Sequence, residues 1–164
     1  MKRTFAILAA AVLLLCSCNR ETVRYEDQRI VRSYTGITAL EIGQRGFDVE
    51  LAPAESDTLS VDIRIDLMVV TGIDPAQMET PVLLEQTGET LAIGDTYARQ
   101  TKTSRGLISV KVPASVRQIG VNTREGNIRA AGLHGDDLRF ASQRGTVDAA
   151  DCRATRQMSV SSAK

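Results

Sequence analysis

The C-terminal part of the chain repeats one pattern, IGVNTREGNIRAAGL at residues 119–133 and LRFASQRGTVDAADC at residues 138–152. The two runs align at an offset of 19 residues, so that Gly126 falls on Gly145 and apolar residues fall on apolar residues. A third copy begins at Met158. Self-similarity near 20 residues is typical of a solenoid, in which stacked units share one apolar interior. The sequence therefore predicts an all-β, single-domain β-solenoid with short stacked strands.

The outward positions of this repeat also match between copies. The offset places Glu125 over Arg144 and Arg129 over Asp148, as opposite charges about 4.8 Å apart in the stacking direction. Each glycine of the repeat follows two polar residues, and we expect it to turn a tight corner with a positive φ. The alternative interpretation is an ordinary antiparallel sandwich whose strands are evenly spaced.

The rest of the chain alternates apolar and polar residues with a period of two. The clearest run is LSVDIRIDL at residues 59–67, which places five apolar residues on one face and is typical of a half-buried strand. Residues 71–81 are expected to form a loop, and residues 94–106 a loop or a ragged hairpin. No run after residue 33 keeps a helical period. Further strands are expected at residues 40–42, 47–51, 82–85, 91–93 and 107–112.

The N-terminus carries the features of an export signal. Lys2 and Arg3 precede an uncharged run at residues 4–15, which is shorter than the roughly 20 apolar residues that span a bilayer. The run ends in Leu-Cys-Ser-Cys at residues 15–18, and this ending resembles the bacterial lipobox, in which a small residue precedes the modified cysteine. The resemblance implies that Cys18 is lipidated and becomes the first residue of the mature protein.

Other interpretations of the N-terminus stay open. Cys16 is the alternative site of lipidation, but Leu15 would then stand where a small residue is expected. A cleaved secretory peptide with incidental cysteines and a short uncleaved anchor are two more. With Cys18 lipidated, we expect a lipoprotein signal peptide at 1–17, a lipidated cysteine and tether at 18–33, and a β-rich domain at 34–164.

Two further motifs carry a family resemblance. Val110-Lys111-Val112-Pro113 leads into the first copy of the repeat, and Tyr34-Thr35-Gly36-Ile37 precedes the alternating strand that begins at Leu40. Over roughly residues 30–164 the chain resembles the bacterial envelope families named "putative auto-transporter adhesin, head GIN domain" and their relatives. The resemblance implies that the strand ending in Val-Pro leads into β-solenoid coils. It carries over no catalytic residues.

The composition gives little support to catalysis, metal binding or nucleic-acid binding. The 20 basic and 20 acidic side chains balance, whereas a nucleic-acid surface needs an excess of basic residues. The single histidine, His134, is expected in a surface turn, and we expect no metal site and no cofactor. With Cys18 lipidated and Cys16 removed, Cys152 is the one remaining thiol, which favours a small buried residue over a reactive group.

Four aspartates are candidates for paired carboxylates in glycoside hydrolysis or for a calcium site. Asp136 and Asp137 are expected to occupy a turn, and Asp148 is expected to pair with Arg129 in the stacked repeat. The spacing of Asp148 and Asp151 lacks the dense Gly-Asp pattern of calcium-binding β-rolls. We therefore expect no catalytic residues and no enzyme.

The sequence favours a lipoprotein of the bacterial cell envelope, anchored preferably to the outer membrane and facing the periplasm or the surface. Its domain is expected to be a non-catalytic binding, adhesion or scaffold module. The expected partners are the membrane, through the lipid, and a glycan or a protein. One alternative is a polysaccharide-acting β-helix enzyme, which the three Tyr, three Phe and absence of Trp disfavour. Another is a structural partner in an envelope assembly or stress complex.

The repeat also makes a prediction about the C-terminal end of the domain. Aligned on its start at Met158, the third copy places its corner glycine at position 165, one residue beyond Lys164. We therefore expect the solenoid to be incomplete at this end. Because an uncapped coil exposes a pairing edge, we also expect self-association through the open end.

Overall fold

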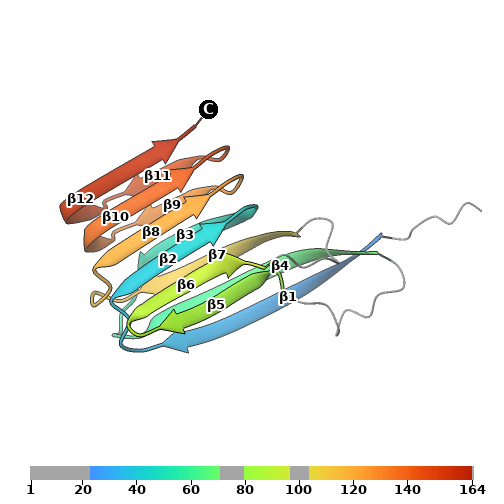
Figure 1. Cartoon of the computed structure of the whole chain (residues 1–164), viewed down its shortest axis with the longest axis horizontal. Coiled ribbons are helices and arrows are strands. Elements are labelled where there is room, and N and C mark those ends of the chain that lie inside the picture. The colour runs from blue at the N-terminus through green and yellow to red at the C-terminus, as the bar shows by residue number, and fades with distance from the viewer. Residues whose placement is uncertain (1–22, 71–79, 97–103, 164) are drawn as a thin grey trace, which may run out of the picture.

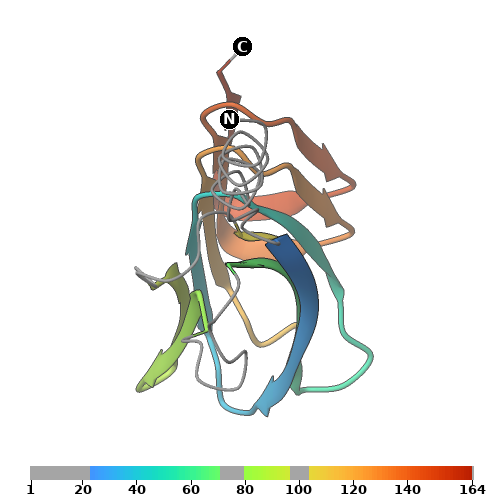
Figure 2. The same cartoon turned by 90° about the vertical axis from the view of Figure 1, so that its right-hand side faces the viewer.

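Two β-sheets that face each other across one apolar core make up the fold (Figures 1 and 2). The computed structural model describes residues 23–70, 80–96 and 104–163. All regular structure in these residues is β-strand, which confirms the all-β prediction. The strands are β1 (Val23–Tyr34), β2 (Ala39–Gln44), β3 (Phe47–Pro53), β4 (Leu59–Val70), β5 (Val82–Thr87), β6 (Thr90–Asp95), β7 (Ser104–Val112), β8 (Gln118–Thr123), β9 (Ile128–Ala131), β10 (His134–Ser142), β11 (Val147–Ala150) and β12 (Arg153–Ser162).

Each sheet contains six strands and mixes parallel with antiparallel pairs. Sheet A has the order β1-β4-β7-β3-β9-β11, and sheet B has the order β12-β10-β8-β2-β6-β5. The strands pair in parallel from β7 to β11 in sheet A and from β12 to β6 in sheet B. In contrast, β4 is antiparallel to both β1 and β7, and β5 forms an antiparallel hairpin with β6.

The 19-residue repeat is confirmed by the strand register. The chain passes from β8 to β12 by alternating between the sheets, so that β8, β10 and β12 lie side by side in sheet B (Figure 1). In sheet A, Val147 of β11 is the partner of Ile128 of β9, as the offset predicts. In sheet B a register shift between β10 and β12 brings Val160 beside Phe140, so the third copy follows at an offset of 20 in this strand.

The prediction of a single-domain β-solenoid over residues 34–164 is wrong as stated. Stacked coils of a solenoid pair in parallel throughout, whereas β1, β4 and β5 run antiparallel to their neighbours. Strands β4 to β7 lie in the sequence between a first coil, made by β2 and β3, and a second coil, made by β8 and β9. Together with β1 they occupy one end of both sheets (Figure 1). The parallel coils therefore form only the other part of a two-sheet fold, which is not an ordinary antiparallel sandwich either.

The first coil extends the repeat to a place that the sequence pattern did not predict. Leu40 of β2 is the partner of Ile119, and Val49 of β3 is the partner of Ile128. The offset is 79 residues because β4 to β7 intervene. A trace of the repeat remains in the tripeptide Gln-Arg-Gly at residues 44–46, which recurs at residues 143–145.

Gly126 and Gly145 occupy equivalent corners of neighbouring coils, as predicted. The reason why glycine is needed at these corners differs from the expected one. Neither Gly126 nor Gly145 has a positive φ. A Cβ on Gly126 would instead fall on the carbonyl oxygen of Phe47, and a Cβ on Gly145 would fall on the carbonyl oxygen of Gly126. Glycine is therefore required at these corners because successive coils approach each other too closely for a side chain.

Residues 18–33 were expected to be a tether, and the structure shows that this is wrong from Val23 onward. Strand β1 pairs along its whole length with β4, and Arg29 holds Asp62 of β4 through two hydrogen bonds of 2.9 and 2.7 Å. The expected loop at residues 71–81 and the middle of residues 94–106 lie largely outside the described residues. Within the described part of the chain, no helix is long and apolar enough to cross a membrane.

The core is built from the inward residues of both sheets. All the alternating runs predicted as strands contribute to it, and Phe47 and Phe140 are among its largest fully buried side chains. A column of three buried polar side chains, Gln44, Thr123 and Ser142, lies at one corner. Thr123 and Ser142 both donate to the carbonyl oxygen of Gly126, at 2.7 and 2.8 Å. These bonds satisfy the hydroxyls at the point where the coils turn.

Candidate functional site

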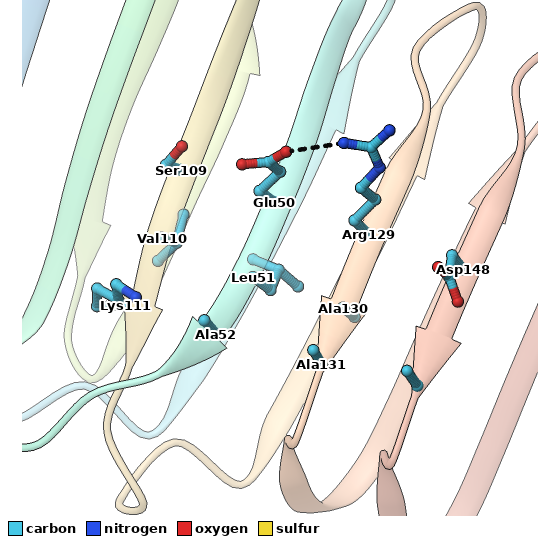
Figure 3. A pocket seen from close by; sticks show the side chains of 11 residues that line it. Glu50, Leu51, Ala52, Ser109, Val110, Lys111, Arg129, Ala130, Ala131 and Asp148 are labelled. Atoms are coloured by element: carbon cyan, nitrogen blue, oxygen red, sulfur yellow. Dashed lines mark hydrogen bonds and ion pairs between the residues drawn. The ribbon is translucent and has the colours of Figure 1, made fainter.

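A shallow groove crosses the outer face of sheet A (Figure 3). Its volume is about 400 Å³, within the range of roughly 300–1,000 Å³ that is typical of ligand sites. Strands β7, β3, β9 and β11 supply the lining, so the groove runs over the junction between the antiparallel end and the coils. The lining residues are Glu50, Leu51, Ala52, Ser109, Val110, Lys111, Arg129, Ala130, Ala131, Asp148 and Ala150.

Two rows of outward side chains shape this groove. Successive residues of a strand point to opposite faces, so every second lining residue faces solvent and the others face the core. A polar row crosses the strands through Ser109, Glu50, Arg129 and Asp148, which are register partners in that order. A second row contains Lys111 beside its register partner Ala52, and Ala131 beside its register partner Ala150. Figure 3 labels the first three of these residues. Because the alanine side chains are short, the surface of the sheet is recessed along the second row.

The polar row is joined at its centre by one ion pair. Arg129 donates to Glu50 at 3.3 Å across the pair β3–β9. The predicted stacking of Arg129 on Asp148 is correct in register, but the ion pair is wrong because the guanidinium binds Glu50 instead. Both partners of the observed pair are well exposed, so its contribution to stability is about 1 kcal/mol or less. The pair orients two charges at the surface more than it holds the fold together.

Opposite charges are available at the two sides of the groove. Lys111 comes from β7 and Asp148 from β11, and neither forms an ion pair within the described residues. A ligand in the groove would therefore meet a cation on one side, an anion on the other and a low alanine floor between them.

The second charged column of the repeat, Glu125 with Arg144, is confirmed as an ion pair of 2.8 Å. It lies at a corner of the coils and belongs to a series of contacts between residues 19 apart. Asn127 accepts hydrogen bonds from the amide and the hydroxyl of Thr146, at 3.0 and 2.9 Å. Such contacts fix the register of the two coils that contain Arg129 and Asp148.

Asp136 and Asp137 do not form a paired-carboxylate site. They lie in strand β10 and not in the expected turn, because the chain continues across the register shift. Asp136 accepts from Arg117 and from Thr155, each at 2.7 Å, and these hydrogen bonds hold the pKa of Asp136 below its ordinary value. Asp137 is bound to Arg156 at 2.6 Å. Both carboxylates therefore bind side chains of neighbouring coils and help to hold these coils together.

The remaining candidate residues form no reactive cluster within the described residues. His134 is exposed as expected, but it begins strand β10 and does not lie in a turn. It is the register partner of Arg153, as the repeat predicts, and it lines a smaller hollow of about 120 Å³ together with Arg117. Cys152 is half-buried, and its thiol approaches the carbonyl oxygen of Ala130 at 3.5 Å. No group of three potential metal-ligating side chains occurs among the residues that the structure describes.

The groove was not found by sequence reasoning, because half of it comes from the unrecognised first coil and from β7. The sequence pattern places Glu50 and Lys111 in two separate expected strands, at residues 47–51 and 107–112, and does not indicate that these strands are neighbours. The available signal was the alternation in FDVELAP at residues 47–53, which matches the outward pattern of β9 once the 79-residue offset is known. The predicted lipidation site, Cys18, lies outside the described residues.

Known proteins resemble the chain in fold and not in sequence. No protein-family model and no curated protein matches it. The chain is similar to the solved structure of a "putative cell adhesion protein" from Clostridium sporogenes, with a TM-score of 0.54 and 10% sequence identity over 84% of this chain. It covers 66% of that protein, less than two thirds of its length.

Two more solved structures show a weaker likeness. One is described as a "putative adhesin" from Parabacteroides merdae and has a TM-score of 0.34 and 12% sequence identity, over 76% of this chain and 63% of that chain. The other is described as a "putative adhesin" from Bacteroides fragilis and has a TM-score of 0.29 and 12% sequence identity, over 80% of this chain and 65% of that chain. At 10% identity the Clostridium sporogenes structure shows a likeness in fold alone. The chain is thus an all-β protein whose fold is shared with the solved Clostridium sporogenes structure.

Proposed function

We propose that the chain is a non-catalytic binding or adhesion module of the bacterial cell envelope, and that it holds its ligand in the groove on sheet A. The observation that carries the proposal is the groove itself, a hollow of about 400 Å³ with charges at its rim and a floor of small side chains. The shared fold with a protein described as a "putative cell adhesion protein" supports the same reading.

The lining of the groove favours a charged, extended ligand. It contains no aromatic side chain, whereas sites for neutral sugars commonly use aromatic platforms. Lys111 and Asp148 instead provide opposite charges on the two sides, with Arg129 and Glu50 between them. A segment of a protein chain that carries both charges fits this pattern better than a neutral glycan does.

Binding is tested with the full chain against immobilised fibronectin, collagen and peptidoglycan and against a glycan array. We expect a protein surface to be bound, and we expect Lys111→Glu and Asp148→Lys each to weaken that binding about tenfold, which corresponds to about 1.4 kcal/mol. Glu85→Lys on β5, which lies in sheet B away from the groove, is the matched control and should leave binding unchanged. Equal binding by all variants would place the ligand elsewhere, and no binding to any probe would contradict an adhesive role.

We also propose that the module is anchored through a lipid on Cys18. The support is the lipobox-like ending of the N-terminal run at residues 15–18. In a bacterium that lipidates exported proteins, Cys18→Ser should abolish labelling of the full chain by radioactive palmitate and release it from the membrane fraction. Cys16→Ser is the matched control and should keep both. Labelling that survives in Cys18→Ser and is lost in Cys16→Ser would show that the other cysteine is the anchor.

A further inference from the structure

The charges that line the groove on sheet A alternate in sign from one strand to the next. Lys111 comes from β7, Glu50 from β3, Arg129 from β9 and Asp148 from β11, and these four strands are neighbours in the sheet (Figure 3). The two central charges, Glu50 and Arg129, neutralise each other at 3.3 Å. Lys111 and Asp148 form no ion pair among the described residues. The groove therefore leaves one cation and one anion, on opposite sides, for a ligand to neutralise.

The sheet fixes the distance between these two unpaired charges. Three intervals of about 4.8 Å between neighbouring strands separate β7 from β11, so the two backbones lie about 14 Å apart. Lys111 lies two residues along β7 from Ser109, the member of β7 in the row of Asp148, which adds an offset of about 7 Å along the strand. The flexible four-carbon side chain of lysine can cover that offset. A ligand must therefore present its two charges about 14 Å apart and on the same side.

Strand pairing cannot hold this ligand. Strands β7, β3 and β9 each have a neighbour on both sides, so their backbone groups are already bonded within the sheet. Only side chains face the groove, and a ligand that spans it lies across the strands. An extended polypeptide advances about 3.4 Å per residue, and its successive side chains point to opposite faces. Residues four apart in such a ligand lie on one face and about 14 Å from each other, whereas residues three apart lie on opposite faces.

Other extended ligands fit the two charges less well. A polyanion such as a nucleic acid would meet Asp148 and Glu50 as like charges, and a neutral glycan would leave Lys111 and Asp148 without counter-charges. A polypeptide can carry side chains of both signs at one regular spacing. The sign and the separation of the unpaired charges therefore both favour a polypeptide.

On the basis of the proposed function, which places the ligand in this groove, we propose that the ligand is an extended polypeptide segment with an acidic and a basic side chain four residues apart. The acidic side chain binds Lys111, the basic side chain binds Asp148, and the segment crosses the strands between them. Because the backbone of the segment joins no strand, it can lie in either direction. The groove thus selects the spacing of the two charges and not their order along the segment.

Synthetic peptides test the spacing. The isotope-labelled full chain in mild detergent is titrated by NMR with capped nine-residue peptides of threonine and valine that contain one aspartate and one lysine. We expect the peptide with these two residues four apart to bind about fivefold more tightly than the isomer with them three apart, because the isomer engages only one of the two charges. Fivefold corresponds to about 1 kcal/mol. The reversed order at the same spacing of four should bind equally well.

Charge-swapped variants test the two partners. Lys111→Glu leaves two anions in place of a cation and an anion, so it should prefer a peptide with two lysines four apart. Adding Asp148→Lys to Lys111→Glu should restore binding of the original peptide, because the peptide then lies in the opposite direction. Glu85→Lys on β5, in sheet B, is the matched control and should leave all affinities unchanged.

The outcomes separate the spacing from the site. Equal binding of the two isomers, both weakened by Lys111→Glu, would overturn the spacing and leave the groove as the binding site. Binding that no groove variant changes would overturn the spacing and the proposed site together. If no peptide shifted any amide signal at millimolar concentration, the inference would be refuted, whereas the proposed function would still be decided by the immobilised proteins and glycans.

Discussion

Gly126→Ala is expected to lower the free energy of unfolding by about 3 kcal/mol, measured by urea denaturation of the full chain. A methyl group at this position would fall on the carbonyl oxygen of Phe47 and would also approach the amide nitrogen of Asp48, at 3.2 Å. These obstacles are backbone atoms, which cannot turn away as a side chain could. The coil must move as a whole, and strain of this kind costs about 1–3 kcal/mol or more.

Gly43→Ala is the matched control for this prediction. Gly43 lies in β2 with an exposed surface, and a Cβ there would meet no atom within 4 Å. The substitution should change stability by about 0.5 kcal/mol or less, and a small gain would agree with the lower chain entropy of alanine in the unfolded state. If the two alanine variants were equally stable, the close approach of the coils would be refuted.

Phe47→Ala is expected to have the largest effect of any single truncation, a loss of about 3–5 kcal/mol. The ring is 1% exposed and lies where the first coil meets the antiparallel end, close to Gly106 of β7. Removal of the ring leaves a cavity. The cavity cannot close by a shift of the neighbouring strands, because β3 holds both β7 and β9 in register. Thermal and urea unfolding should both shift.

The control for this truncation is Val31→Ala, which removes an apolar side chain from the exposed face of β1. It should cost about 0.5 kcal/mol or less. A loss below about 1 kcal/mol for Phe47→Ala would show that the junction between the coils and the antiparallel end is not packed as the structure has it.

The sequence predicted the strands well because alternation with one apolar face is a local signal. LSVDIRIDL at residues 59–67 falls within β4, and the inward residues Val61, Ile63 and Ile65 are fully buried. The 19-residue repeat predicted the partners of β9 and β10 for a similar reason, since adjacent coils are adjacent in sequence. Local periodicity is thus sufficient for the elements and for the coils near the C-terminus.

The remaining architecture depends on pairings that leave no local trace. The sequence patterns of β1 and β4 do not indicate that these two strands pair with each other. They also do not indicate that β7 lies between β4 and strand β3 of the first coil. The mixed charges of residues 19–33 favoured a tether, yet Arg29 finds its partner in Asp62, far along the chain. For the same reason the groove could not be predicted, because Lys111 and Glu50 come together only through the parallel pair of β3 and β7.

Strands β4 to β7 interrupt the stack of coils after the first one, and this has a consequence for the order of folding. Joining the second coil to the third closes a loop of 19 residues, whereas joining the first to the second closes one of 79 residues. Closure entropy grows as the logarithm of loop length, so the longer closure costs about 1.3 kcal/mol more. We therefore expect nucleation to begin among the C-terminal coils, with β2 and β3 docking later and setting the overall rate of folding.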